Sequence, residues 1–146
     1  VKEQIEELVG DKIYEEGTAY QRALEWILDV DPMQLDKDSP YIIQRYLLAL
    51  LYYSTDVKGK WRYCAPLPKD VEETEENIVC EATVYDEEGE PIEGEKFKVF
   101  LSGVHECDWY GIKCRGTDDF VREIEMIEHN MTGTLPPELA QMPVIQ

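Results

Sequence analysis

Four cysteines are the most reactive side chains in this sequence, and they fall into two neighbouring pairs: Cys64 with Cys80, and Cys107 with Cys114. Such thiols can pair as disulfides, stay reduced in a cytosolic protein, or bind zinc as thiolates. Four cysteines allow three connectivities, of which sequential pairing is the simplest. Zinc would recruit His105 beside Cys107, but the six residues between the last two cysteines are not the spacing of a zinc knuckle. We therefore expect two disulfides, each adding about 2–4 kcal/mol of stability.

The histidines and carboxylates form no recognisable catalytic pattern. His105 and His129 have no nucleophile close to them in sequence, and the chain contains neither a G-x-S-x-G elbow nor a Gly-rich phosphate loop. The acidic run from Asp86 to Gly89 lacks the alternate-position ligands of a calcium-binding loop, although weak calcium association there stays open. We expect a protein that is not an enzyme and that needs no cofactor and no dedicated metal site.

One sequence motif concerns modification. Asn130-Met131-Thr132 is the only N-glycosylation sequon of the chain. It falls where a turn is expected, so Asn130 should be accessible to a glycan. Together with the cysteines, the sequon favours passage through the secretory pathway, so we expect a secreted or cell-surface protein.

Composition narrows the class of partner. The chain has 146 residues, is 43% hydrophobic and carries a formal net charge of −18, which suits one domain with a real core. A field this negative repels nucleic acid and anionic membranes, and no apolar run approaches the length of a membrane span. We expect no nucleic-acid binding and no membrane insertion by this segment.

Helical patterns dominate the first third of the chain. Residues 1–13 read as an amphipathic helix that ends at Gly10. Thr18 and Gln21 form a capping box that opens a second helix through about Val30, with a buried stripe of Tyr20, Ala23, Leu24, Ile27 and Leu28. Ser39-Pro40 is a start signal for a third, strongly apolar helix through Tyr53, which we expect at the centre of the domain.

The residue patterns in the middle and at the end of the chain predict extended structure. Residues 78–85 alternate like a strand, residues 97–100 are the expected partner, and the acidic segment 86–94 is the turn. Farther on, Ile124 and Met126 suit a short strand with Glu125 facing solvent. Pro136 and Pro137 then suit the start of a short helix or 3₁₀ turn. The spaced apolar residues of this last part are Val121, Ile124, Met126, Met131, Leu135, Leu139, Met142 and Ile145.

This spacing, with Gly133 and Pro136 in register, resembles one unit of a leucine-rich repeat (LRR). In such a unit Val121, Met131, Leu135 and Leu139 fill the inside of a coil. The preceding segment CDWYGIKC, residues 107–114, resembles the end of the N-terminal cap of plant-type extracellular LRR proteins. One departure is His129, which stands where the family usually has an asparagine that ties one coil to the next.

The order of the earlier segments is similar to the cap of diatom-type LRR proteins. The matching stretches are YQRALEWIL (20–28), QRYLLALLYYST (44–55), GKW (59–61) and FLS (100–102). The resemblance implies a helical cap that shields the apolar end of the first coil. Residues 64–98 lie outside it, and we expect them to form a β-hairpin inserted into the cap.

The sequence therefore predicts an α+β protein in two parts. Residues 1–120 form a helical LRR N-terminal cap with an acidic hairpin insertion at about 64–103 and the Cys107–Cys114 loop. Residues 121–146 form the first coil of an LRR solenoid that continues beyond the chain.

The resemblance implies a recognition module that binds a protein or glycan ligand through Arg122, Glu123 and Glu125. The alternative is a structural subunit of an extracellular filament or matrix that self-associates through the open solenoid end, with calcium as a modulator. A domain fused to an enzyme or kinase is a third reading, which the residues neither support nor exclude.

Overall fold

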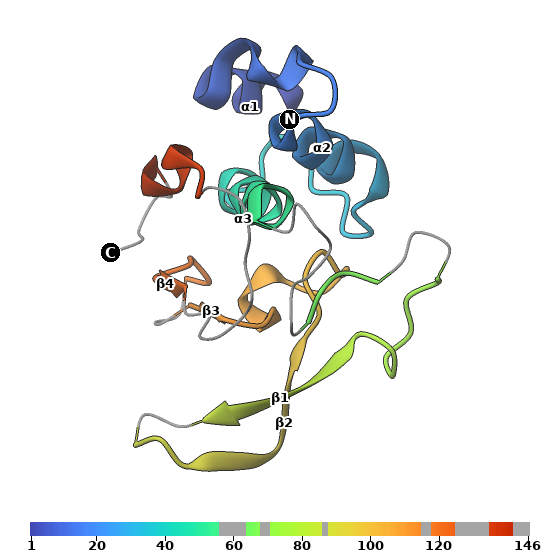
Figure 1. The fold of residues 1–146 in the computed structure, drawn as a ribbon, viewed down its shortest axis with the longest axis vertical. Helices are drawn as coiled ribbons and strands as arrows, with labels where there is room; N and C mark the ends of the chain where they lie inside the picture. Colours follow the sequence, from blue (N-terminus) through green and yellow to red (C-terminus); the bar gives the residue numbers. More distant parts are fainter. Residues whose placement is uncertain (56–63, 68–70, 86–87, 115–117, 125–134, 142–146) are drawn as a thin grey trace.

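The computed structural model describes residues 1–55, 64–67, 71–85, 88–114, 118–124 and 135–141. These residues form three α-helices, short 3₁₀ and π-helical turns, and two small antiparallel sheets, so the fold is of the α+β class (Figure 1). Figure 1 shows the helices gathered at one end of the molecule and a long hairpin extending from the other. The described residues contain no stacked coils, and most residues of the predicted coil lie outside them.

The N-terminal helix ends where the sequence predicts. Helix α1 spans Lys2–Val9 and stops at Gly10, which has a φ of 69° and is the first residue of the 3₁₀ turn η1, Gly10–Tyr14. A glycine suits this position because other residues rarely adopt a positive φ. The apolar stripe of α1 is anchored by Ile5 and Val9, which are both buried.

The second helix has the predicted extent but changes geometry at its end. Thr18 caps helix α2, Ala19–Glu25, by accepting a hydrogen bond from the backbone N–H of Gln21. Residues Trp26–Val30 then form a π-helical turn, η2, closed by a bond from the N–H of Asp31 to the carbonyl of Trp26. The wider turn ends the helix at Asp31, which is fully buried.

Helix α3, Ile42–Thr55, is the centre of the fold, as expected (Figure 1). It starts later than predicted, because Ser39 Oγ accepts from the N–H of Tyr41 in a turn that precedes the helix. Its tyrosines serve the core and its rim, since Tyr46 is fully buried and Tyr52 and Tyr53 are partly so.

The insertion contains the predicted hairpin, but its second strand lies earlier in the chain than predicted. Strand β1, Val79–Tyr85, pairs with β2, Pro91–Lys98, which begins well before Phe97. Apolar alternation misses most of β2, and this ribbon extends away from the helices (Figure 1). Proline is tolerated at its first position because the strand lies at a sheet edge.

The second sheet joins the cysteine loop to the predicted repeat. Strand β3, Ile112–Lys113, is antiparallel to β4, Glu123–Ile124, with Ile112 opposite Ile124 and Lys113 opposite Glu123. The predicted turn after the paired prolines is the 3₁₀ helix η4, Pro137–Gln141.

Two apolar residues of the predicted coil have different environments. Val121 is fully buried, as expected, but Leu135 is 59% exposed, so its prediction as a coil-filling residue is wrong. Pro136, the next residue, is buried instead. A shift of one residue in an irregular segment is enough to reverse which side chain points inward.

Candidate interaction surface

The candidate surface lies next to a hydrogen-bond network that is centred on a buried arginine. Arg45 of α3 is fully buried, and its Nε and Nη2 donate to the carboxylate oxygens of Asp31 at 2.6 and 2.7 Å. Nη1 donates to Glu106 Oε1 at 3.1 Å and to the carbonyl of Val104 at 2.9 Å, and Nη2 donates to the carbonyl of Ser102 at 2.8 Å. The five N–H donors of the guanidinium therefore have five acceptors, which offsets the cost of burying its charge.

Tryptophan rings enclose the same guanidinium. The rings of Trp26 and Trp109 lie 5.2 and 4.8 Å from the carbon of the Arg45 guanidinium and meet each other edge to face at 6.0 Å. Trp109 is fully buried, and its Nε1 donates to Ser102 Oγ at 3.1 Å. The tryptophan of the Cys107–Cys114 loop is thus a core residue that ties this loop to the helices.

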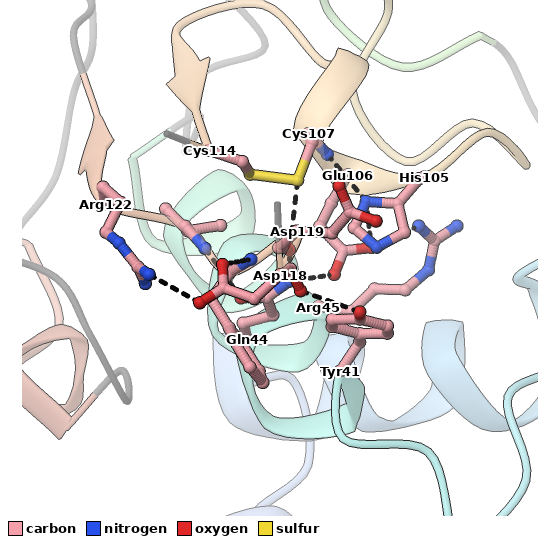
Figure 2. The surroundings of a disulfide bond; sticks show 12 residues. Tyr41, Gln44, Arg45, His105, Glu106, Cys107, Cys114, Asp118, Asp119 and Arg122 are labelled. Atoms are coloured by element: carbon pink, nitrogen blue, oxygen red, sulfur yellow. Dashed lines mark hydrogen bonds and ion pairs between the residues drawn. A yellow bond between two sulfur atoms is a disulfide. The ribbon is translucent and has the colours of Figure 1, made fainter. Parts of the chain in front are cut away.

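The side chain of Gln44 links this buried network to the start of the predicted repeat (Figure 2). Its fully buried side chain donates to Glu106 Oε2 at 2.6 Å and to the carbonyl of Asp119 at 3.1 Å. Its Oε1 accepts from the backbone N–H of Val121 at 3.0 Å. One amide therefore holds the chain immediately before strand β4.

The candidate binding residues lie next to this anchor. Arg122 and Glu123 are both partly exposed, and Arg122 Nη2 forms an ion pair with Asp118 Oδ2 at 2.6 Å. The hydrogen bond from the Phe120 N–H lowers the pKa of Asp118, and the bond from Arg122 lowers it further. Asp118 is therefore ionised at neutral pH and orients the Arg122 guanidinium.

A cluster of aromatic side chains lies next to the Arg122–Asp118 ion pair. Tyr41 packs edge to face on His105, with ring centroids 4.8 Å apart, and its ring centroid lies 5.3 Å from that of Phe120. The Tyr41 hydroxyl donates to the carbonyl of Asp118 at 2.9 Å (Figure 2). Aromatic and arginine side chains together are typical of the energetic centre of protein interfaces.

The cysteines are all paired, with the sequential connectivity. Cys64 is bonded to Cys80 and Cys107 to Cys114. The zinc alternative fails, because His105 Nδ1 accepts from the N–H of Cys107 and the Cys107 sulfur is in a disulfide. Within the described residues no group of three or more histidine, cysteine or acidic side chains is placed to hold a metal ion.

Two predicted site residues lie outside the described residues. These are Glu125 of the binding face and the glycosylation candidate Asn130. The described part of the binding face is therefore Arg122 and Glu123, at the edge of the β3–β4 sheet.

Sequence reasoning missed the buried polar network. Asp31 and Glu106 stand at a helix end and in a loop of the predicted structure, whereas Gln44 and Arg45 stand inside the predicted third helix, and all four are fully buried. The available signal was the polar pair Gln44-Arg45 inside an otherwise apolar helix, which is unusual for a helix at the centre of a domain.

Comparison with known proteins provides no assignment: no known protein family, no curated protein sequence and no solved structure matches this chain. The disulfides are typical of extracellular proteins. No helix in the described part of the chain has the length and apolar character of a membrane span.

Proposed function

We propose that the chain is a recognition module of a secreted or cell-surface leucine-rich-repeat protein. The observation that carries this proposal is the pairing of β3 with β4, with Ile112 opposite Ile124. It joins the C-x-W-x-G-x-x-C segment to the first predicted repeat strand, which is the arrangement that a cap leading into a solenoid needs. The module binds a protein or glycan partner through the surface at Arg122 and Glu123.

The rigidity of this surface supports a binding role. The backbone on either side of Arg122 is held by the Gln44–Val121 hydrogen bond and by the antiparallel pair of Lys113 with Glu123. A preformed surface loses less conformational entropy on association than a loop that must be ordered.

A binding screen with charge-reversal variants tests the proposal. The full chain is displayed to an array of secreted proteins and glycans, and hits are remeasured with Arg122→Glu and Glu123→Lys. We expect at least a tenfold loss of affinity, about 1.4 kcal/mol or more. Lys2→Glu and Glu3→Lys on α1 are matched controls, since α1 lies beyond α3 from β4 (Figure 1).

Binding that responds equally to both sets of variants would contradict the assignment of the face. Non-reducing peptide mapping of the native protein tests the compartment. We expect linked 107–114 peptides and a glycan on Asn130, whereas free thiols and an unmodified Asn130 would place the protein outside the secretory pathway.

Self-association is a second candidate function, which the exposure of Leu135 favours. This large apolar side chain is 59% exposed next to η4 and could contact a second copy. Sedimentation velocity over a range of concentrations, with wild type and Leu135→Glu, separates the two candidates. A recognition module stays monomeric, whereas an assembling subunit sediments faster with concentration and loses this behaviour in the variant.

A further inference from the structure

A groove of about 650 Å³ separates the helical layer from the inserted segment. Helices α2 and α3 form one side, and residues 66–67 and 71–73 form the other. The floor is apolar and consists of Trp26, Val99, Phe100 and Leu101, which are all buried. This volume lies within the usual range of binding pockets.

The outer wall of the groove is held in place before any ligand arrives. Glu73 Oε2 accepts from the backbone N–H of Gly103 at 2.9 Å, which ties the wall to the floor segment. Asn77 braces the wall from within. Its Nδ2 donates to the carbonyl of Glu72 and its Oδ1 accepts from the N–H of Thr74, both at 2.7 Å. The groove is therefore largely preformed.

The rim combines apolar and acidic side chains. Val30 and Val71 are 55% and 41% exposed, which leaves apolar surface on both sides of the groove. Glu25 and Glu72 are exposed on the same two sides, and neither carboxylate has a hydrogen bond or ion pair with a described residue.

The other charged residues of the groove are already engaged. The Arg22 guanidinium packs over the ring of Tyr53 at 4.6 Å, and Glu73 bonds to Gly103. The groove thus offers an apolar floor between two carboxylates on opposite walls. That arrangement complements an apolar group with positive charge on both sides.

We propose that this groove binds an extended segment of a partner protein in which an apolar side chain is flanked by lysine or arginine. The apolar side chain occupies the floor over Phe100 and Leu101, and the flanking cations pair with Glu25 and Glu72. A peptide fits better than a compact small molecule, because the groove is open and its carboxylates stand on separate walls. This site is distinct from the Arg122 surface and does not depend on the LRR assignment.

Calorimetry with matched peptides tests the proposal on the intact, oxidised chain. The probe is a short blocked peptide of alternating lysine and leucine, titrated at physiological salt. One comparison peptide replaces lysine with glutamate and another replaces leucine with serine. We expect saturable binding of the first peptide only, with a change in tryptophan fluorescence because Trp26 lines the groove.

Variants separate the groove from the general negative charge of the protein. Glu25→Gln with Glu72→Gln should weaken binding about threefold to tenfold, as expected for two partly exposed ion pairs. Glu15→Gln with Glu16→Gln removes the same charge from an exposed turn and should leave affinity nearly unchanged. Val71→Asp should remove the difference in affinity between the lysine–leucine peptide and the peptide in which serine replaces leucine.

Several outcomes would overturn the proposal. Equal effects of the two glutamate pairs would show that the peptide responds only to net charge. Binding of the serine peptide as tightly as the leucine peptide would exclude an apolar contact. Absence of binding by the lysine–leucine peptide, or binding of an uncharged apolar dye alone, would exclude a cationic peptide as the occupant.

Discussion

The helical cap and the inserted hairpin reach stability by different means. The cap buries a continuous apolar cluster of helices α1–α3 together with Phe100, Trp109 and Val121, and places a fully paired arginine inside it. The hairpin base has a small cluster of its own, formed by Cys64, Ile78, Cys80 and Val99. Because a two-stranded hairpin is marginally stable in water, a covalent bond replaces the missing core. We therefore expect that the insertion can be loosened without loss of the cap.

The largest effect is expected for Arg45→Met. The variant leaves Asp31 and Glu106 buried without their cationic partner, so the free energy of unfolding should fall by about 3–5 kcal/mol. Urea denaturation followed by tryptophan fluorescence measures it. Adding Asp31→Asn and Glu106→Gln should recover part of the loss, and Arg22→Met is an exposed control. A loss below about 1 kcal/mol would contradict the idea that this network organises the cap.

The next effect concerns the hairpin. Cys64→Ser with Cys80→Ser should lower the free energy of unfolding by about 3 kcal/mol, since the disulfide closes a loop with a sequence separation of 16. Limited proteolysis should then cut the hairpin first, while the near-ultraviolet circular dichroism of Trp109 persists. Simultaneous loss of the Trp109 signal would show that the hairpin and the cap unfold as one unit.

A smaller effect is expected at the joint between the C-terminal turn and the cap. Glu138 of η4 is buried and accepts from the Tyr20 hydroxyl at 2.8 Å and from Lys12 Nζ at 3.1 Å. Burial alone would raise the pKa of Glu138, but the hydrogen bonds from Tyr20 and Lys12 outweigh it and keep the pKa below 4.5. Glu138→Gln should cost about 1 kcal/mol at neutral pH, because Tyr20 loses a charged acceptor.

The pH dependence of this joint follows from the direction of the shift. A lowered pKa in the folded state gives stability that is complete above the unfolded value and is lost as the pH falls through the folded value. The difference between wild type and Glu138→Gln should therefore shrink as the pH falls below about 4.5. Glu16→Gln, in an exposed turn, is the control. A difference that is constant with pH would mean that ionised Glu138 does not hold the joint.

The smallest stability effect is expected for Arg122→Ala. The Arg122–Asp118 pair is exposed, and such pairs contribute little to folding. The melting temperature should stay within about 2 °C of wild type, although partner binding should weaken. Differential scanning fluorimetry beside the binding assay separates the two effects. A large drop in melting temperature would make Arg122 a structural residue of the cap.

Local signals explain how much could be predicted from the sequence. Gly10 and Thr18 marked helix boundaries correctly, because caps depend on a few neighbouring residues. Local signals cannot predict the ion network, because the acceptors of Arg45 stand 14 and 61 residues away in the sequence. In the sequence, Arg45 resembles a solvent-facing residue of an amphipathic helix. Leu135 failed for a related reason: a periodic pattern gives the spacing of apolar residues, but not the phase of an irregular turn.

A long stretch of chain separates helix α3 from the backbone carbonyls that accept hydrogen bonds from Arg45. The chain leaves the helix at Thr55, and only after Phe100 do the carbonyls of Ser102 and Val104 accept hydrogen bonds from Arg45. The entropy of closing such an excursion grows only with the logarithm of its length, by about 0.6 kcal/mol for each doubling. The tip of the hairpin within this excursion can therefore be lengthened or shortened at a small entropic cost, while the helices and the Arg45 network stay in place.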